Sequence, residues 1–230
     1  MLKLYLALFN TTSLRKELNK MNKQNGTHYH IVLDKSGSMQ SHYKETLEGL
    51  NEKLHSIKAI QERNLDQPIY VSLTLFSDSP ELVFENLPAA ELPMLTEKDY
   101  VLDGMTGLLD AIGTVINRMK YAVGRDLKEK NGTVMIVIFT DGGENASRIF
   151  KFPEISSTIK ELEATGNWNF AFIGADIDAW GAASRLNMQQ SRVYSSQKAN
   201  IKETMNFAAE ALENSIHQKR SGKNWEGFSE

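Results

Sequence analysis

The sequence predicts an α/β fold: a doubly wound, mostly parallel central sheet with one antiparallel edge strand and helices on both faces. Short apolar runs alternate along the chain with longer segments in which apolar residues recur every three or four positions. This alternation is typical of parallel strands joined by crossover helices. A turn signal at residues 77–80 separates two of the strands, which predicts the antiparallel one. The 230 residues suffice for one such domain with little left over.

The apolar content of each predicted strand indicates its place in the sheet. The run Val134–Phe139 is continuously apolar, as expected of a central parallel strand that is covered on both faces. The run Leu82–Phe84 lies within hairpin reach of Ile69–Phe76, so we expect it at the edge. In chain order, the predicted strands are Tyr29–Leu33, Ile69–Phe76, Leu82–Phe84, Val134–Phe139, Phe170–Ile173 and Val193–Tyr194.

Four segments show the apolar spacing of amphipathic helices. One starts near Gln40, and the next follows Gly107. A third has Pro153 in its first turn, where a missing backbone N–H costs nothing. The apolar faces are Tyr43, Leu47, Leu50, Leu54 and Ile57; Leu108, Ile112, Val115 and Met119; Ile155, Ile159 and Leu162; and Ile201, Met205, Ala208, Leu212 and Ile216.

The chain divides into an N-terminal arm over residues 1–27, the domain over 28–217 and a polar C-terminal tail over 218–230. The apolar start of the arm is shorter than the roughly 20 residues of a membrane span. It also lacks a small-residue cleavage site of a signal peptide. We therefore expect a loosely attached arm, or translation that begins at Met21, and a cytoplasmic protein.

Composition excludes several function classes. The formal net charge of −3 argues against a nucleic-acid binder, which usually presents a basic face. The chain has no cysteine, so disulfides, thiolate zinc sites and cysteine catalysis are excluded. No P-loop is present, Ser36 lacks the G-x-S-x-G context of a nucleophile elbow, and no Ser-His-Asp set is legible.

Two carboxylates and three hydroxyls stand where predicted strands end or a predicted helix begins. They are Asp34, Ser36 and Ser38 after the first strand, Thr106 before a helix, and Asp141 after the most apolar strand. The carboxyl ends of parallel strands meet at one edge of an open sheet, where ligands bind. Hard oxygen ligands suit Mg²⁺, with Mn²⁺ as the alternative. The pattern predicts a metal site at this edge.

The order Asp34-x-Ser36-x-Ser38, then Thr106, then Thr140-Asp141-Gly142 resembles the metal-ion-dependent adhesion site of the von Willebrand factor type A domain. The resemblance covers roughly residues 28 to 217. The segment Phe170–Trp180 further resembles bacterial stand-alone members of that family. The resemblance implies the type A, Rossmann-like fold. It also implies that Ser36, Ser38 and Thr106 bind the ion through hydroxyls, while Asp34 and Asp141 bind directly or through water.

The resemblance implies a binding module and not an enzyme. A partner protein would supply an Asp or Glu carboxylate to an open coordination position on the ion. An accessory subunit that regulates an ATPase, kinase or phosphatase complex is the first alternative. A Mg²⁺-dependent phosphohydrolase is the second, although such an enzyme should carry a second Asp where this chain has Ser36.

Other polar residues near these motifs have two readings each. We expect Asp110 to interact with a helix dipole, and Asp103 to be either an outer acceptor of the metal site or a loop residue. Glu144 and Asn145 either tune specificity or are merely exposed. His28 and His30 are expected to pack rather than bind metal. Asp176, Asp178 and Trp180 are expected to cap and pack at the rim. The closing helix is either static or a switch coupled to the metal, and we favour the static helix.

Overall fold

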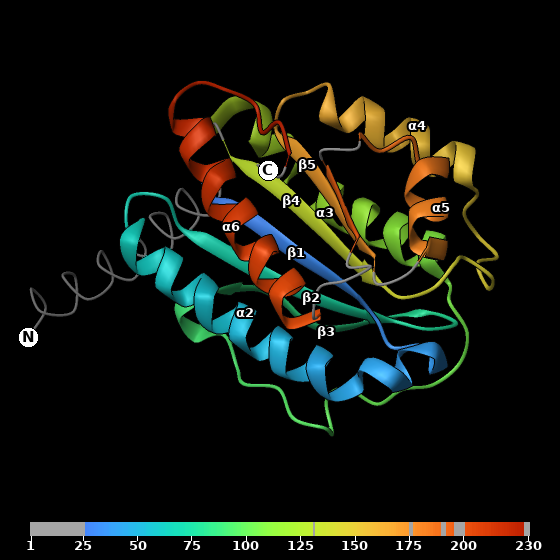
Figure 1. Ribbon diagram of the computed structural model, residues 1–230. Helices are drawn as coiled ribbons and strands as arrows, with labels where there is room; N and C mark the ends of the chain where they lie inside the picture. Colours follow the sequence, from blue (N-terminus) through green and yellow to red (C-terminus); the bar gives the residue numbers. More distant parts are fainter. Residues whose placement is uncertain (1–25, 131, 175–176, 190–191, 196–200, 228–230) are drawn as a thin grey trace, which may run out of the picture.

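The computed structural model describes residues 26–130, 132–174, 177–189, 192–195 and 201–227. The expected arm up to residue 25 and Asp176 lie outside them. Figure 1 shows one sheet between two layers of helices. The six strands run in the order β3-β2-β1-β4-β5-β6. All neighbouring pairs are parallel except β2 and β3, which confirms the predicted α/β fold class.

The strands match the predicted runs and extend them by a few residues. Every residue of β1, β2 and β4 is buried, as their apolar runs indicated. Strand β3 has exposed and half-buried residues, as an edge strand should. The strands are β1 Thr27–Asp34, β2 Ile69–Phe76, β3 Pro80–Pro88, β4 Thr133–Thr140, β5 Trp168–Gly174 and β6 Val193–Ser195.

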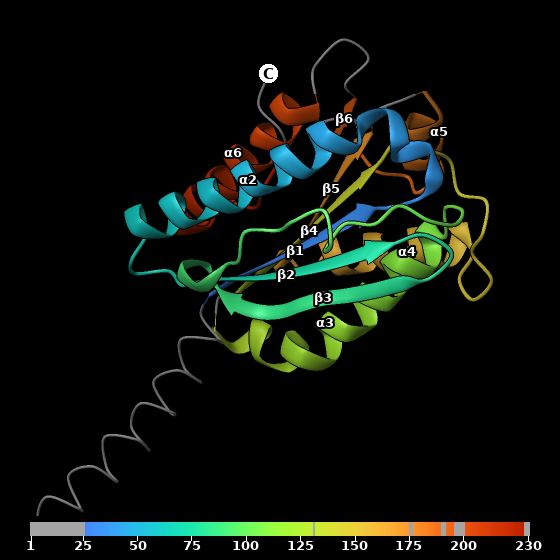
Figure 2. The same ribbon diagram turned by 90° about the horizontal axis from the view of Figure 1, so that it is seen from below.

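Helices α2 and α6 cover one face of the sheet, and α3, α4 and α5 cover the other, as Figures 1 and 2 show. Odd-numbered residues of β1 pack toward α2 and α6, whereas Val32 packs in the core on the α3 side. This alternation follows from the two-residue period of a strand. The helices are η1 Gly37–His42, α2 Tyr43–Arg63, η2 Ala89–Glu91, α3 Leu108–Lys130, α4 Phe152–Glu163, α5 Ile177–Arg185 and α6 Ile201–Arg220.

The structure differs from the sequence-based boundaries at three points. Strand β1 begins at Thr27, inside the expected arm. Helix α5 was not predicted, because its nine residues offer too few apolar positions for a periodic pattern. Within the expected polar tail, α6 continues to Arg220, and Trp225 is buried in the same core cluster as residues of α2 and α6.

Over the described residues, no helix is both long enough and apolar enough to span a membrane.

Candidate metal centre

The five predicted side chains come together at the carboxyl edge of the sheet. The loops after β1 and β4 and the loop before α3 meet at the same end of the molecule in Figure 1. The Ser36 and Ser38 hydroxyls lie 3.0 Å apart, and Ser38 Oγ donates to Asp141 Oδ1 at 2.7 Å. A Cβ on Gly142 would lie 3.5 Å from Ser38 Oγ and 3.7 Å from Thr106 Oγ1, which places Thr106 in the same cluster.

Asp34 is fully buried, and both of its carboxylate oxygens already accept hydrogen bonds. The Ser36 backbone N–H donates to Oδ1 at 2.7 Å, and the Thr140 hydroxyl donates to Oδ2 at 2.6 Å. Burial raises the pKa of Asp34, these hydrogen bonds oppose the rise, and the neighbouring Asp141 adds to it. The geometry suits a carboxylate that orients its loop and reaches a cation through water.

Thr106 is positioned by the hairpin between β2 and β3. The Gly107 N–H donates to the Ser77 carbonyl at 2.7 Å, and the Met105 N–H donates to Asp78 Oδ1 at 3.0 Å. Gly104 has a φ of +63° and packs so closely that a Cβ would lie 2.7 Å from the Asp78 carboxylate. Only glycine adopts this backbone conformation without strain while leaving room for the carboxylate.

The loop that follows Asp141 is held against the start of α3 by reciprocal hydrogen bonds. Asn145 Oδ1 accepts from the Thr106 N–H at 2.8 Å, and Glu144 Oε2 accepts from the Leu109 N–H at 2.9 Å. Asp110 accepts from the three backbone N–H groups of residues 148–150. These contacts give Glu144, Asn145 and Asp110 a structural task, which is to fix the loop beside Thr106.

Tyr100, Glu81 and Asp103 hold the loop after β1, and sequence reasoning missed the first two. The buried Tyr100 hydroxyl donates to the Asp34 carbonyl at 2.7 Å. Lys35 Nζ lies 3.0 Å from Glu81 and 3.5 Å from Asp103. Burial alone would lower the pKa of Lys35, but the two carboxylates raise it by more than burial lowers it. The pKa therefore lies above its usual value, and the lysine stays charged. Asp103 is therefore an ion-pair partner on an exposed loop. No motif identifies Tyr100 or Lys35.

The alternating histidines of β1 lie away from this cluster. His28 Nδ1 pairs with Asn86 Oδ1 at 3.0 Å, and His30 Nε2 pairs with the Thr74 hydroxyl at 2.8 Å. Burial, aided by Arg118, lowers the pKa of His30 to about 3, so its imidazole is neutral. Both side chains are buried in the protein, which agrees with the expected packing role.

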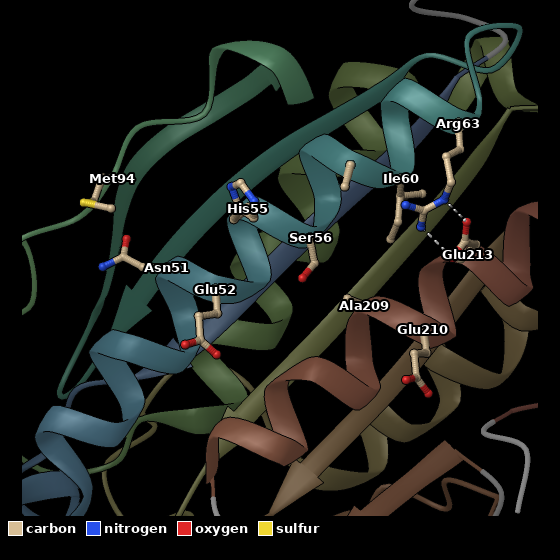
Figure 3. Close-up of a pocket in the computed structure, with 11 residues that line it drawn as sticks. Asn51, Glu52, His55, Ser56, Ile60, Arg63, Met94, Ala209, Glu210 and Glu213 are labelled. Carbon is tan, nitrogen blue, oxygen red and sulfur yellow. Dashed lines mark hydrogen bonds and ion pairs between the residues drawn. The ribbon is translucent and has the colours of Figure 1, made fainter.

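A groove of about 760 Å³ lies along α2 and α6, and none of the five predicted site residues lines it. Figure 3 shows the pair that bridges its two helices, in which Arg63 donates to both carboxylate oxygens of Glu213.

Across the described residues, no three His, Cys, Asp or Glu side chains gather into a metal-binding group. The cluster at the carboxyl edge of the sheet combines two carboxylates with three hydroxyls. All of these ligands are oxygens, without sulfur or imidazole, and such a set suits a hard cation.

The architecture matches solved structures of type A domains. The von Willebrand factor domain of the pilus tip protein Mfa5 from Porphyromonas gingivalis superposes with a TM-score of 0.56 and 12% identity, over 81% of this chain and 95% of that one. The chain has the fold of a von Willebrand factor type A domain. No protein-family model and no curated protein sequence matches the chain.

Two other structures share the type A fold. The manganese-loaded TRAP protein of Plasmodium vivax gives a TM-score of 0.57 and 16% identity, over 80% of this chain and 72% of that one. The ArnB paralog VWA2 of Sulfolobus acidocaldarius gives a TM-score of 0.51 and 19% identity over 83% of this chain. The chain spans 45% of the length of VWA2. These identities support the likeness of fold alone.

Proposed function

We propose that this type A domain is a divalent-cation-dependent protein-interaction module. Ser36, Ser38 and Thr106 would supply neutral hydroxyl oxygens to Mg²⁺ or Mn²⁺, and Asp34 and Asp141 would act directly or through water. The observation that carries the proposal is the convergence of the Ser38, Thr106 and Asp141 side chains around Gly142. The manganese-loaded TRAP protein, which shares the fold, gives further support.

The donor set explains why such a site would bind a partner. Only two formal negative charges face a divalent cation, so the ion retains affinity for a further anionic oxygen. Asp34 is held by Ser36 and Thr140, and Tyr100 fixes its backbone, so the loop is ordered before binding. An Asp or Glu carboxylate of a partner protein would complete the coordination. A preorganised loop reduces the entropy lost on docking.

Calorimetric titration of metal-stripped protein tests the proposal. We expect Mg²⁺ and Mn²⁺ to release or absorb heat with one site and to raise the melting temperature. The stabilisation follows RT ln(1 + [L]/Kd), which is about 2.7 kcal/mol at 100 Kd. Asp141→Ala should abolish both effects, whereas Glu97→Ala, at an exposed position, should leave them unchanged. The absence of heat and of thermal shift with both metals would refute the metal site.

A Mg²⁺-dependent phosphohydrolase is the competing function, and it predicts turnover. We expect no Mg²⁺-dependent release of phosphate from p-nitrophenyl phosphate, because Ser36 stands two residues after Asp34 where a second Asp is needed. Turnover that Asp34→Asn abolishes would favour the enzyme.

The cytoplasmic location stays a prediction, and fractionation of the native cells would test it.

A further inference from the structure

The groove of about 760 Å³ along α2 and α6 has an acidic lining. Glu52 of α2 lines it, and so do Glu210 and Glu213 of α6; Figure 3 shows the three carboxylates on the two helices. Among the described residues of the lining, the only arginine is Arg63, which pairs with Glu213 at 3.0 Å. With His55 neutral, carboxylates outnumber cations there, so the groove attracts positive charge.

Apolar side chains accompany these charges. Ile60 and Ala209 line the groove, and Met94, which is 82% exposed, lines it from the loop after η2 (Figure 3). Asn51 fixes this loop on α2, because its side chain donates to the Leu95 carbonyl at 2.9 Å and accepts from the Leu95 N–H at 2.8 Å. An exposed thioether adapts well to apolar partners. A segment that fits the groove therefore needs an apolar face with positive charges beside it.

Residues 14–23 of the same chain have this pattern. Leu14, Leu18 and Met21 are four and three positions apart, a spacing that places side chains on one face of a helix. The basic residues between and after them are Arg15, Lys16, Lys20 and Lys23. The whole chain has a formal net charge of −3, so this basic segment contrasts with the rest of the protein. Such a segment is typical of a helix that binds a groove or an anionic surface.

The chain enters the domain beside one end of the groove. The Thr27 N–H donates to the Pro68 carbonyl at 2.9 Å, and the Gln67 side-chain amide donates to the Thr27 hydroxyl at 2.9 Å. The Gln67 N–H donates to the carbonyl of Asn64 at 3.1 Å, and Asn64 directly follows Arg63. The residues that precede Thr27 therefore start from the end of the groove that Arg63 lines.

The segment and the groove also have matching lengths. As a helix, residues 14–23 would measure about 15 Å, and α2 measures about 18 Å from Asn51 to Arg63. Residues 24 and 25, when extended, span about 7 Å between the segment and the start of β1. A segment placed this way runs alongside α2 in the same direction, with Leu14 near Met94 and Lys23 near Glu213.

We infer that residues 14–23 dock in the groove between α2 and α6 of their own chain. The face of Leu14, Leu18 and Met21 covers the apolar side chains of the groove, and the basic residues lie against its glutamates. An anionic membrane is the competing ligand of a basic amphipathic segment, but it would repel the same glutamates. The inference is independent of the proposed function, because no candidate metal ligand lines the groove.

A nitroxide label on the full chain tests the docking. The chain has no cysteine, so Asn19→Cys provides a single attachment site in the segment. A nitroxide broadens the NMR signals of amides close to it. We expect broadening at Ser56 and Ala209, which line the groove, and none at Thr114 of α3 on the other face of the sheet. Absence of broadening at Ser56 and Ala209 would overturn the inference.

Two pairs of variants in the labelled chain separate specific docking from loose attraction. Leu18→Ser removes an apolar side chain of the segment and should abolish the broadening, whereas Asn22→Ser, at a polar position, should preserve it. Glu210→Lys reverses a charge of the groove and should also abolish it. Glu154→Lys is the matched control, because Glu154 is exposed on α4 on the opposite face of the sheet. Equal effects within either pair would contradict docking in this groove.

Three other results would also overturn the inference. Broadening that appears only when a labelled chain is mixed with an isotope-enriched, unlabelled one would assign the segment to the groove of a second copy. Binding of the full chain to anionic lipid vesicles, without broadening in the groove, would assign the segment to a membrane surface. Intact mass spectrometry of the native protein completes the test, because a chain that begins at Met21 would lack Leu14 and Leu18.

Discussion

At the scale of single residues, the candidate centre contains two kinds of side chain: candidate ligands of the metal ion, and residues whose hydrogen bonds hold the loops that carry those ligands. Asp34 and Thr140 form a buried hydrogen bond of 2.6 Å, and Tyr100 holds the Asp34 backbone. Ser38 and Asp141 instead face one another in the cluster near Gly142. Loss of a buried supporting contact therefore threatens the loop itself. Loss of Thr106 or Asp141 removes a donor at the edge and leaves both apolar cores untouched.

We predict that Thr106→Ala and Asp141→Ala abolish metal binding and partner docking while the protein stays folded. Asp141→Ala also removes a negative charge that raises the pKa of Asp34, so the metal-free protein should be at least as stable as the parent. Circular dichroism and calorimetry measure the two properties on the same samples. Loss of the folded spectrum in both variants would mean that the site maintains the fold.

A buried lysine makes the stability of the protein depend on pH. Lys53 is fully buried between α2 and α6, where its amine donates to the Met205 carbonyl at 3.4 Å and lies over the rings of Tyr29 and Phe139. Burial lowers its pKa well below the usual 10.5. Between that lowered pKa and about pH 10.4, the unfolded chain binds a proton that the folded protein does not, so stability rises with pH in this window.

We predict that Lys53→Met removes this dependence. Between the lowered pKa of Lys53 in the folded protein and about pH 10.4, the parent should gain up to about 1.4 kcal/mol per pH unit that the variant does not gain. Urea unfolding at pH 7, 8 and 9 gives the difference between the two proteins. Lys44→Met, at an exposed position on the same helix, serves as the control. Parallel pH curves for Lys53→Met and the parent would show that the buried amine is charged.

At the scale of elements, the β2–β3 hairpin is a support of the site as well as an edge of the sheet. Its tip contributes the Ser77 carbonyl and the Asp78 carboxylate to the loop of Thr106. Helix α6, by contrast, is anchored to the middle of the protein, because the Tyr29 hydroxyl donates to its Ala208 carbonyl at 3.2 Å. The static α6 stays a prediction.

We predict that Asp78→Ala weakens Mg²⁺ binding about tenfold without removing a ligand, as loss of a supporting contact does at other metal sites. Asp78→Asn should restore most of the affinity, because its side-chain carbonyl can accept the Met105 N–H. Calorimetry compares the three proteins. If Asp78→Asn were as weak as Asp78→Ala, the negative charge and not the hydrogen bond would be responsible.

At the scale of the whole molecule, the sheet separates two apolar cores, and the C-terminal segment completes one of them. Trp225 is 3% exposed and packs in the core with α2 and α6, and the Arg192 guanidinium lies 5.6 Å from its ring. The segment after α6 therefore belongs to the folded domain. We propose that the domain reaches beyond residue 217, where its polar composition had placed the boundary.

We predict that Trp225→Ala lowers the free energy of unfolding by about 3 kcal/mol, the lower end of the cost for a buried tryptophan. Ending the chain at residue 217 should cost at least as much. Lys223→Ala, at an exposed position, should cost little. Urea denaturation measures all three. A Trp225→Ala variant as stable as the parent would return residues 218–230 to the status of a dispensable tail.

The sequence by itself determined the sheet, its central strands and the five candidate ligands. Period-two and period-3.6 apolar patterns are local, and so is a motif at the end of a strand, so both can be read along the chain. Only the tertiary structure decided what supports those ligands. Tyr100, Thr140, Asp78 and Asn145 act through hydrogen bonds to residues 27 to 106 positions away. Lys53 and Trp225 look exposed in sequence and are buried, because only packed helices can enclose them.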